Sequence, residues 1–460
     1  MNRRKFLNKT LYSAMAASGM VSASGILQLA KASALQNSAI GGSGYKALVC
    51  VFLDGGNDSA NMVVPMGAAE HAAYEQVRGD LSLDSADLLP ISPSNNGGRS
   101  WGLHPDLPQI QALFNQGTAA LISNIGSLAY PITQVEYNNG SVPIPPNLFS
   151  HSDQQQQWQA SIADQPSLTG WSGRIADLLH NSVNANNDLS MNVSLDGNNA
   201  LQVGALINQY HITNQGSVSL SVGDCCDGGR RLDALQDVLT GSSQTNLFAQ
   251  GYTDIFNRAV DLDQVISSAL TGAVEFAVNF PDQDGSNSLS AQLEMVAKMI
   301  SIQSTLGMNR QVFFVRVGGF DNHDNHLNDH AIGMQNLDGA VGAFQAAMAE
   351  IMMENDVTLF TASDFSRTWR SNGQGSDHGW GASHFVIGGD VNGGDFYGNM
   401  PVIEVGSTDA ISDHGRVIPT IAVDEYAATL SQWFGVGSGD LTDIFPNLGR
   451  FNSSDLGFMT

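Results

Sequence analysis

The sequence predicts an α/β fold in which a doubly wound, mostly parallel sheet is flanked by helices. Residues 46–53 form a nearly continuous apolar run, which is typical of a central parallel strand buried on both faces. From residue 289 onward, helical and strand patterns alternate, and this alternation implies a parallel sheet. Acids and histidines crowd the end of the strand predicted at 357–361, where open α/β sheets bind ligands.

The composition agrees with a large folded protein. The chain has 460 residues and 42% hydrophobic content, which is enough for a substantial core. Asp plus Glu number 44 against 19 for Lys plus Arg, so the net charge is −25. Such a field repels phosphate backbones, and we expect no nucleic-acid partner. A charge of this size also keeps secreted proteins soluble.

The N-terminus predicts a signal peptide over residues 1–34. Arg3 and Arg4 form a twin-arginine pattern, residues 11–29 are weakly apolar, and 32–34 read Ala-Ser-Ala. The twin-arginine export machinery is therefore an expected partner, and the expected location is periplasmic or secreted. No later run reaches the roughly 18 apolar residues that a membrane span requires. We expect residues 35–460 to form one domain.

The remaining elements follow from apolar periodicity. Residues 190–285 are the least regular part and are interpreted as an insertion or cap, with strands at 191–195 and 218–222 and helices at 232–239 and 252–277. Elsewhere the pattern predicts helices at 105–115, 151–158, 170–180, 289–307 and 327–354, and a last helix that is capped by Asp424 and ends at 434. It predicts strands at 118–125 and 312–317 and a further strand that opens with His384. Edge strands are expected at 402–405 and 417–423.

Three predicted strands end in the same kind of sequence. Because the carboxyl ends of parallel strands lie on one edge, Asp54, Asp321 and Asp364 are expected to converge. Carboxylates this close repel one another unless they are protonated or bridged by cations. Mixed Asp/His ligation suits zinc or manganese, with magnesium or calcium also open. The candidate metal ligands are Asp54, Asp58, Asp321, His323, Asp364, Asp377, His378 and His384.

Several of these residues have a structural alternative. Asp54 and Asp58 suit a tight turn through two glycines, and the late histidines suit hydrogen bonds within a loop. His104 and His151 are weaker candidate ligands, because either could instead fix the start of a helix, whereas His326 and His330 are expected to be solvated on a helix. Cysteine adds little: Cys50 lies in the first strand, and Cys225 and Cys226 are adjacent.

The catalytic groups are less sharply defined. Arg367 follows Asp364 by three residues and could bind a substrate oxyanion or pair with a neighbouring Asp. Ser59, Ser150 and Ser152 are candidate nucleophiles, because a hydroxyl near paired metals can be deprotonated. Attack by water remains an alternative. Two metals a few ångströms apart commonly hydrolyse phosphate-type esters.

Several blocks of the chain resemble a known family of exported bacterial proteins. They are LVCVFLDGGNDSANMVVP, GLHPDL, SHSDQQQQWQ, GGFDNHDNH, SDFSRTWRSNGQGSDHGWGASHFVIGG with GGDFYG, and IPTIAVDEYAATLSQWFG. They are similar to the domain of unknown function 1501 family, which more distantly resembles the alkaline phosphatase and sulfatase superfamily. The resemblance implies an alkaline-phosphatase-like sheet with one or two metals at the strand ends and a Ser, Thr or modified Cys nucleophile.

Carried over to this chain, the resemblance makes Asp54 the first-strand metal ligand, Asp321 and His323 the middle pair, and Asp364 the acid of the late strand. The superfamily's late strand ends in an Asp-His pair, but here Phe365 follows Asp364. Either His378 or His384 then takes the histidine's place, or one metal is missing. A literal Ser-Asp-His-Gly at 412–415 lacks a preceding apolar strand, and no Cys-x-Pro-x-Arg block exists for a formylglycine sulfatase.

Together these features predict an exported, metal-dependent hydrolase of phosphate or sulfate esters. Its substrate would be a small anionic ester or sugar, and its cofactor a divalent metal, with zinc preferred. The alternative is a non-catalytic periplasmic protein that keeps the fold and binds an anionic sugar or a partner.

Overall fold

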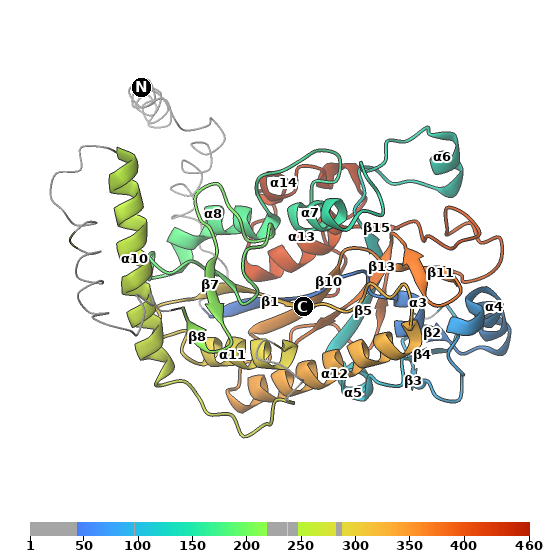
Figure 1. Cartoon of the computed structure of the whole chain (residues 1–460), viewed down its shortest axis with the longest axis horizontal. Helices are drawn as coiled ribbons and strands as arrows, with labels where there is room; N and C mark the ends of the chain where they lie inside the picture. The colour runs from blue at the N-terminus through green and yellow to red at the C-terminus, as the bar shows by residue number, and fades with distance from the viewer. Residues whose placement is uncertain (1–43, 96, 219–236, 238–246, 282–287) are drawn as a thin grey trace.

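The computed structural model describes residues 44–95, 97–218, 237, 247–281 and 288–460. Within them, one large sheet forms the centre of the molecule (Figure 1). Its strands are β1 (Lys46–Leu53), β5 (Ala119–Gly126), β6 (Asn192–Ser194), β7 (Tyr210–Thr213), β8 (Gly216–Ser217), β9 (Arg310–Val317), β10 (Val357–Ser363), β13 (Ala382–Ile387), β14 (Phe396–Tyr397) and β15 (Ile421–Ala422).

The order of the sheet is β14-β5-β13-β10-β1-β9-β6-β7-β8, with β15 also paired to β5. Strands β10, β1, β9, β6 and β7 run parallel, whereas β13 lies antiparallel between β10 and β5. Strand β1 is central, and residues 47–53 are buried, as expected of a strand covered on both faces. The predicted α/β class and its mostly parallel sheet are confirmed.

Helices cover both faces of this sheet (Figure 1). One face carries α7 (His151–Ala160), α8 (Trp171–Val183), α13 (Val423–Phe434) and α14 (Leu441–Ile444). The other carries α5 (Pro108–Asn115), α11 (Leu289–Ser301) and α12 (His326–Glu350). Helix α10 (Leu247–Leu270) lies at the β7–β8 end of the sheet (Figure 1).

At the opposite end lie α6 (Gln134–Asn139), α4 (Ala68–Arg78) and two small sheets (Figure 1). The sheets are formed by β2 (Val63–Pro65), β3 (Leu89–Ile91) and β4 (Trp101–Leu103), and by β11 (Arg367–Ser371) with β12 (Ser376–His378). Helix α3 (Ser59–Met62) and the 3-10 turns η1 (Gly79–Leu81) and η2 (Leu448–Arg450) complete the described elements.

Some element boundaries differ from the sequence prediction. Helix α5 begins at Pro108 rather than 105, because Pro108 supplies the fixed φ of a first helical residue. Helix α11 ends at Ser301, and turns follow up to residue 307. Helix α12 ends at Glu350, four residues before the predicted end. Asp424 lies in the first turn of α13, and Ala422 is the N-cap.

The prediction of edge strands at 402–405 and 417–423 was largely wrong. Residues 402–405 form no strand, and Val402 and Val405 are exposed, so their apolar character serves no sheet face. Of residues 417–423, only β15 and an isolated bridge at Val417 are extended pairs. Short apolar runs cannot be assigned from periodicity alone.

Part of the predicted insertion at 190–285 belongs to the central sheet. Strand β6 pairs with β9, and β7 pairs with β6. Helix α10 begins and ends earlier than the predicted helix at 252–277. Most of the strand at 218–222, most of the helix at 232–239, both vicinal cysteines and the signal peptide lie outside the described residues. No helix among the described residues is long and apolar enough to cross a membrane.

Burial of Asp424 in α13 gives a testable dependence of stability on pH. Burial raises the pKa of Asp424 to about 7, with Arg174 opposing the shift. The folded pKa therefore exceeds the unfolded value of about 3.9, so the wild-type protein loses stability as the pH rises from about 4 through 7. We expect Asp424→Asn to raise the free energy of unfolding by roughly 1–4 kcal/mol at pH 8.5 and to change it little at pH 4.

Urea denaturation at the two pH values measures this difference. Asp413→Asn, at an exposed loop position, is the control and should leave the pH dependence unchanged. A variant of Asp424 that is less stable than the wild type at pH 8.5 would contradict the assignment.

Candidate metal centre

The carboxyl ends of β1, β9 and β10 bring three aspartates to one edge of the sheet. Leu53 is in register with Val317 of β9 and Ser363 of β10, so Asp54 and Asp364 leave the sheet side by side. A Cβ on Gly55 would collide with the backbone of Asp321, and its φ is +113°. A glycine at this position therefore lets the turn after β1 approach the loop that carries Asp321.

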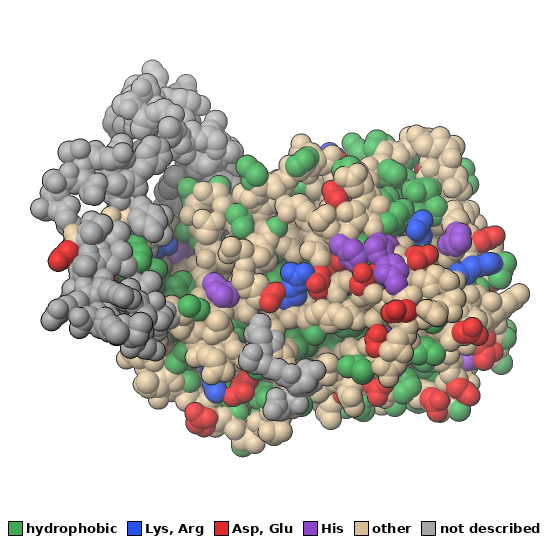
Figure 2. Space-filling view, in the orientation of Figure 1, with side chains coloured by type: hydrophobic (Ala, Val, Ile, Leu, Met, Phe, Trp, Pro, Cys, Tyr) green, Lys and Arg blue, Asp and Glu red, His purple; other side chains and the backbone are tan. Residues whose placement is uncertain are grey.

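Three histidines meet Asp321 above this edge. His151 is the first residue of α7, His378 ends β12, and His323 follows Asp321 in the loop before α12. The His378 Nε2 atom lies 3.1 Å from His151 Nε2 and 3.0 Å from His323 Nε2. The residues His151, Asp321, His323 and His378 are called the His/Asp cluster below. Histidine side chains gather beside acidic ones on this face of the molecule (Figure 2).

Asp321 contacts all three imidazoles. Its Oδ1 atom lies 3.1 Å from His323 Nε2 and 3.3 Å from His378 Nε2, and its Oδ2 atom lies 3.5 Å from His151 Nε2. Donor atoms of His151, Asp321 and His378 all lie within 4.8 Å of one another. Ligands of a tetrahedral zinc ion, at 2.0–2.1 Å from the metal, would lie about 3.3 Å apart. The observed spacing fits such an ion.

The other ring nitrogen of each histidine faces an acceptor. His151 Nδ1 lies 2.6 Å from Asp364 Oδ2, His378 Nδ1 lies 2.7 Å from the carbonyl oxygen of Phe149, and His323 Nδ1 lies 3.6 Å from Asp377 Oδ1. A carbonyl only accepts, so we infer that His378 donates from Nδ1 and keeps a lone pair on Nε2. Metal-binding histidines are oriented in this way by carboxylates and carbonyls.

Phe149 presents its carbonyl from an uncommon backbone conformation. Its φ is +72°, in the left-handed region that an aromatic residue rarely adopts. Such a conformation costs on the order of 1–3 kcal/mol and persists only where surrounding contacts maintain it. The hydrogen bond to His378 is one such contact.

The pKa values of the cluster members are shifted in different directions by their surroundings. The hydrogen bond to Asp364 raises the pKa of His151 despite partial burial, whereas burial lowers the pKa of His378. Burial favours a higher pKa for Asp321, but the hydrogen bond and charge of Arg367, with the nearby histidines, outweigh it and lower that pKa. Asp321 is therefore held as a carboxylate at neutral pH.

Arg367 is placed differently from the expected substrate contact. Its side chain is buried, and its N–H groups donate to Asp321 Oδ1 at 2.7 Å, to the Gly55 carbonyl at 3.0 Å and to Ser376. The ion pair with a neighbouring aspartate, which the sequence left open, is the observed arrangement. Arg367 fixes the position of Asp321 instead of facing the solvent.

Asp54 and Asp364 lie next to the cluster and share one hydrogen-bond donor. Gln155 Nε2 lies 2.5 Å from Asp54 Oδ1 and 3.1 Å from Asp364 Oδ2. Asp54 Oδ2 also accepts from Arg316 at 2.5 Å. Asp377 reaches the cluster only through the Nδ1 side of His323. These three acids therefore surround the cluster rather than face its centre.

Asp58 and His384 are separate from the cluster. Asp58 is fully buried, pairs with Arg78 and accepts from His326 Nε2 at 2.8 Å. Burial opposes ionisation of Asp58, but Arg78 and His326 lower its pKa. His384 packs against aromatic rings in the core, where burial lowers its pKa to about 3. The expectation that His326 and His330 are solvated was wrong, because both are buried.

The serine candidates are not paired with a histidine in the part of the chain described. Ser150 Oγ donates to Asp153 Oδ2 at 2.6 Å, and Ser152 Oγ lies 3.3 Å from Ser150 Oγ. Ser59 Oγ accepts from the backbone N–H of Ser383 at 2.8 Å and lines a different pocket.

Sequence reasoning undervalued two residues on α7. It ranked His151 below the other candidate ligands, with a helix start as the alternative, and it gave Gln155 no role. The two lie four residues apart, so they share one face of the helix. This four-residue spacing was the feature of the sequence that could have indicated that both side chains face the same site. Phe365, which replaces the expected histidine, packs its ring against His151 and His378 with centroids 4.8 Å away in both cases.

An open cleft of about 510 Å³ adjoins the cluster. This volume is large enough for a small molecule. The cleft is lined mainly by polar and charged residues of the strand ends and α7, namely Asp54, Gly55, His151, Gln155, Arg316, Gly319, Asp321, Asn322 and Asp329.

These features define an α/β protein with a candidate His/Asp metal centre at the carboxyl edge of its sheet. Residues 45–416 match the family described as "Protein of unknown function (DUF1501)", and the chain belongs to that family. The matched region contains the whole cluster. No curated protein matches the sequence.

Comparison with solved structures finds a sulfatase, a lipoteichoic acid synthase and an alkaline phosphatase, all at low identity. The PsFucS1 sulfatase from Pseudoalteromonas sp. is 11% identical over 91% of this chain and 72% of that chain, with a TM-score of 0.34. Lipoteichoic acid synthase LtaP from Listeria monocytogenes is 11% identical over 90% and 81%, with a TM-score of 0.33. Alkaline phosphatase from the Antarctic bacterium TAB5 is 10% identical over 75% and 92%, with a TM-score of 0.25.

The opposite pKa shifts of His151 and His378 predict an order of protonation in metal-free protein. As the pH falls from 8, His151 should gain its proton before His378, because Asp364 stabilises the charged His151 ring whereas burial disfavours charge on His378. Histidine ring ¹⁵N NMR, assigned with single His→Gln variants, measures both titrations. Asp364→Asn should lower the pKa of His151. Protonation of His378 at the higher pH would contradict the geometry.

Proposed function

We propose that the chain is an exported hydrolase of phosphate or sulfate esters that depends on a divalent metal held by the His/Asp cluster. The observation that carries this proposal is the contact between His151 Nε2 and His378 Nε2 at 3.1 Å, with the opposite nitrogens of both rings engaged by acceptors. When both rings are neutral and donate from Nδ1, their Nε2 lone pairs face one another, which is unfavourable by itself. A cation between them removes that repulsion.

The donor set favours zinc. Imidazole nitrogens suit zinc and other late transition metals, whereas magnesium and calcium prefer sites made of oxygens. His151, Asp321 and His378 would supply three protein donors, whose atoms lie within 4.8 Å of one another, and His323 lies beside them. Manganese remains the next candidate.

Bound at this position, the metal would supply Lewis acidity to an ester oxygen in the cleft. The residues of the chain hold the geometry for that role. Arg367 fixes Asp321, while Asp364 and the Phe149 carbonyl fix the planes of His151 and His378. Contacts of this kind orient the ligands of a metal and tune its properties.

Among the candidate nucleophiles, the contacts favour water over serine. Ser150 is the serine adjacent to His151, but its hydroxyl donates to Asp153. Hydrogen bonds from Ser150 and Asn147 lower the pKa of Asp153, so this carboxylate is a weak base. Ser59 and Ser152 likewise have no histidine partner in the described part of the chain.

Export through the twin-arginine pathway is part of the same proposal. Arg3, Arg4 and the Ala-Ser-Ala site at 32–34 support it. The pathway carries folded cargo, which allows a metal to be loaded before export.

Metal content tests the ligand assignment. After purification without chelator, we expect zinc in the wild-type protein by plasma mass spectrometry and a loss of at least 80–90% of it in His151→Ala and His378→Ala, since each change removes a donor. His414→Ala, at an exposed position outside the cluster, is the matched control. Unchanged zinc in both cluster variants would overturn the assignment.

A panel of aryl phosphates, phosphodiesters and sulfate esters tests the reaction class with the same preparations. Zinc-dependent turnover that is absent from His151→Ala supports the hydrolase. Zinc binding without turnover of any ester supports the non-catalytic binding protein instead.

The role of Asp364 gives a separate expectation. Asp364→Asn keeps an acceptor for His151 but removes the charge, so zinc affinity should fall about 10–100-fold. Competition with a chromophoric chelator measures the affinity, and Asp413→Asn serves as the exposed control. Equal affinities of Asp364→Asn and wild-type protein would show that Asp364 does not orient the ligand.

A further inference from the structure

Beside the His/Asp cluster, the oxygens of Asp54 and Asp364 are already engaged by donors of the protein. Asp54 accepts from Gln155 and Arg316, both at 2.5 Å. Asp364 accepts from the Gly55 backbone N–H at 3.3 Å, from Gln155 at 3.1 Å and from His151 at 2.6 Å. Each of the four carboxylate oxygens therefore has a partner.

These contacts offset the charge that otherwise calls for a second metal. The guanidinium of Arg316 neutralises Asp54 directly, and the ring of Phe365, which offers no ligand atom, packs against His151 and His378. A cation at Asp54 would have to displace both Arg316 and Gln155.

We propose that the site holds a single metal and that Arg316 is its second cation, which binds the anionic group of the substrate. This inference rests on the proposed function. It specifies the substrate as an anion that can contact both the metal and Arg316. Arg316 is a specificity-determining residue in this account.

The surroundings of Arg316 fit this role. It lies near the end of β9 and lines the open cleft together with His151 and Asp321. Its side chain is 36% exposed, whereas that of Arg367 is 0% exposed and bonded on each of its three nitrogens.

Arg316 also keeps donor capacity. Its Nη2 bonds Asp54, and its Nε lies 3.9 Å from Asp196, beyond hydrogen-bond distance. Among the described residues, no hydrogen bond joins Nη1 to the protein. A guanidinium with free N–H groups binds phosphate or sulfate oxygens in a fixed fork.

The scarcity of positive charge makes this arginine decisive. With 19 basic residues against 44 acidic ones, the field of the chain repels anions. Only local cations can reverse that repulsion in the cleft, and Arg316 is the one basic residue among the residues that line it.

The test measures binding of inorganic phosphate and sulfate to zinc-loaded protein by isothermal titration calorimetry. We expect Arg316→Met to weaken phosphate binding at least tenfold without loss of zinc, and Arg316→Lys to retain part of the affinity. Thermal unfolding of both variants checks that they fold.

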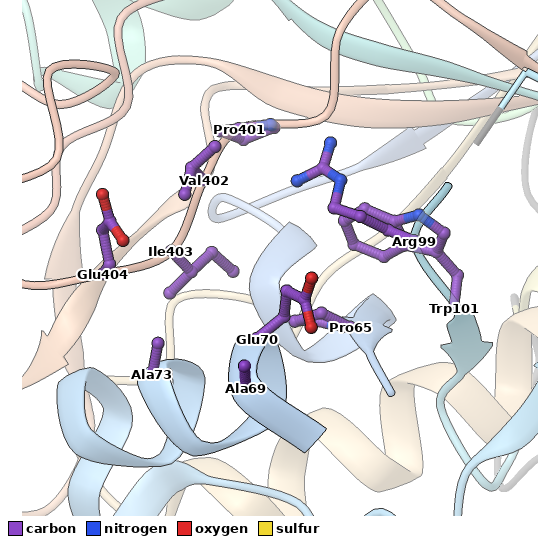
Figure 3. A pocket seen from close by; sticks show the side chains of 10 residues that line it. All are labelled: Pro65, Ala69, Glu70, Ala73, Arg99, Trp101, Pro401, Val402, Ile403 and Glu404. Carbon is purple, nitrogen blue, oxygen red and sulfur yellow. The ribbon is translucent and has the colours of Figure 1, made fainter. Parts of the chain in front are cut away.

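Arg99→Met is the matched control. Arg99 is also partly exposed and also has a side-chain hydrogen bond, at 3.1 Å to the Met400 carbonyl. It lies over Trp101 in a separate pocket between β4, α4 and residues 401–404 (Figure 3). This variant should bind phosphate as the wild type does.

Zinc stoichiometry is the second measurement. One equivalent per chain, retained in Asp54→Ala, supports the inference. Two equivalents, of which Asp54→Ala loses one, overturn it, as does phosphate affinity that is absent in the wild type or unchanged in Arg316→Met. If the wild type binds no zinc, the proposed function and the single-metal inference both fail, and the titration still decides whether Arg316 binds the anion.

Discussion

The repulsion among carboxylates at the ends of β1, β9 and β10 is the constraint on which this site depends. Parallel strands in register bring Asp54, Asp321 and Asp364 to one edge, where unpaired negative charges would destabilise the fold. Each carboxylate has a different partner that offsets this repulsion: Arg316 for Asp54, Arg367 for Asp321, and His151 for Asp364. The site is therefore largely neutralised by its own residues, and only the imidazole nitrogens around Asp321 remain directed at one another.

The pattern of the sequence was sufficient to predict β1, β9 and β10 and their shared edge. A continuous apolar run marks β1, and acids directly after a strand mark the ligand-binding edge. Periodicity could not reveal that α7 would bring His151 over that edge, because this contact depends on how helices pack on the sheet. It also could not distinguish a buried, ion-paired Asp58 from a ligand, since the partner Arg78 lies 20 residues away on another helix.

Charge alone was a poor guide to the role of each arginine. Arg367 follows an aspartate closely in sequence, which left an anion contact and an ion pair equally open, and its contacts bury its side chain completely. Arg316 stands within a strand, where its role depends on which end of the strand opens into a cleft. Only the sheet register and the exposed fraction of each side chain separate the two cases. Such distinctions are three-dimensional and have no signature in spacing.

The central claim is that His151, Asp321 and His378, with His323 beside them, bind one divalent ion. X-ray absorption at the zinc edge of the loaded protein tests it most directly. The account predicts a first coordination shell of nitrogen and oxygen at about 2.0–2.1 Å with multiple scattering from at least two imidazoles. A shell of oxygens alone, or one without imidazole scattering, would contradict it.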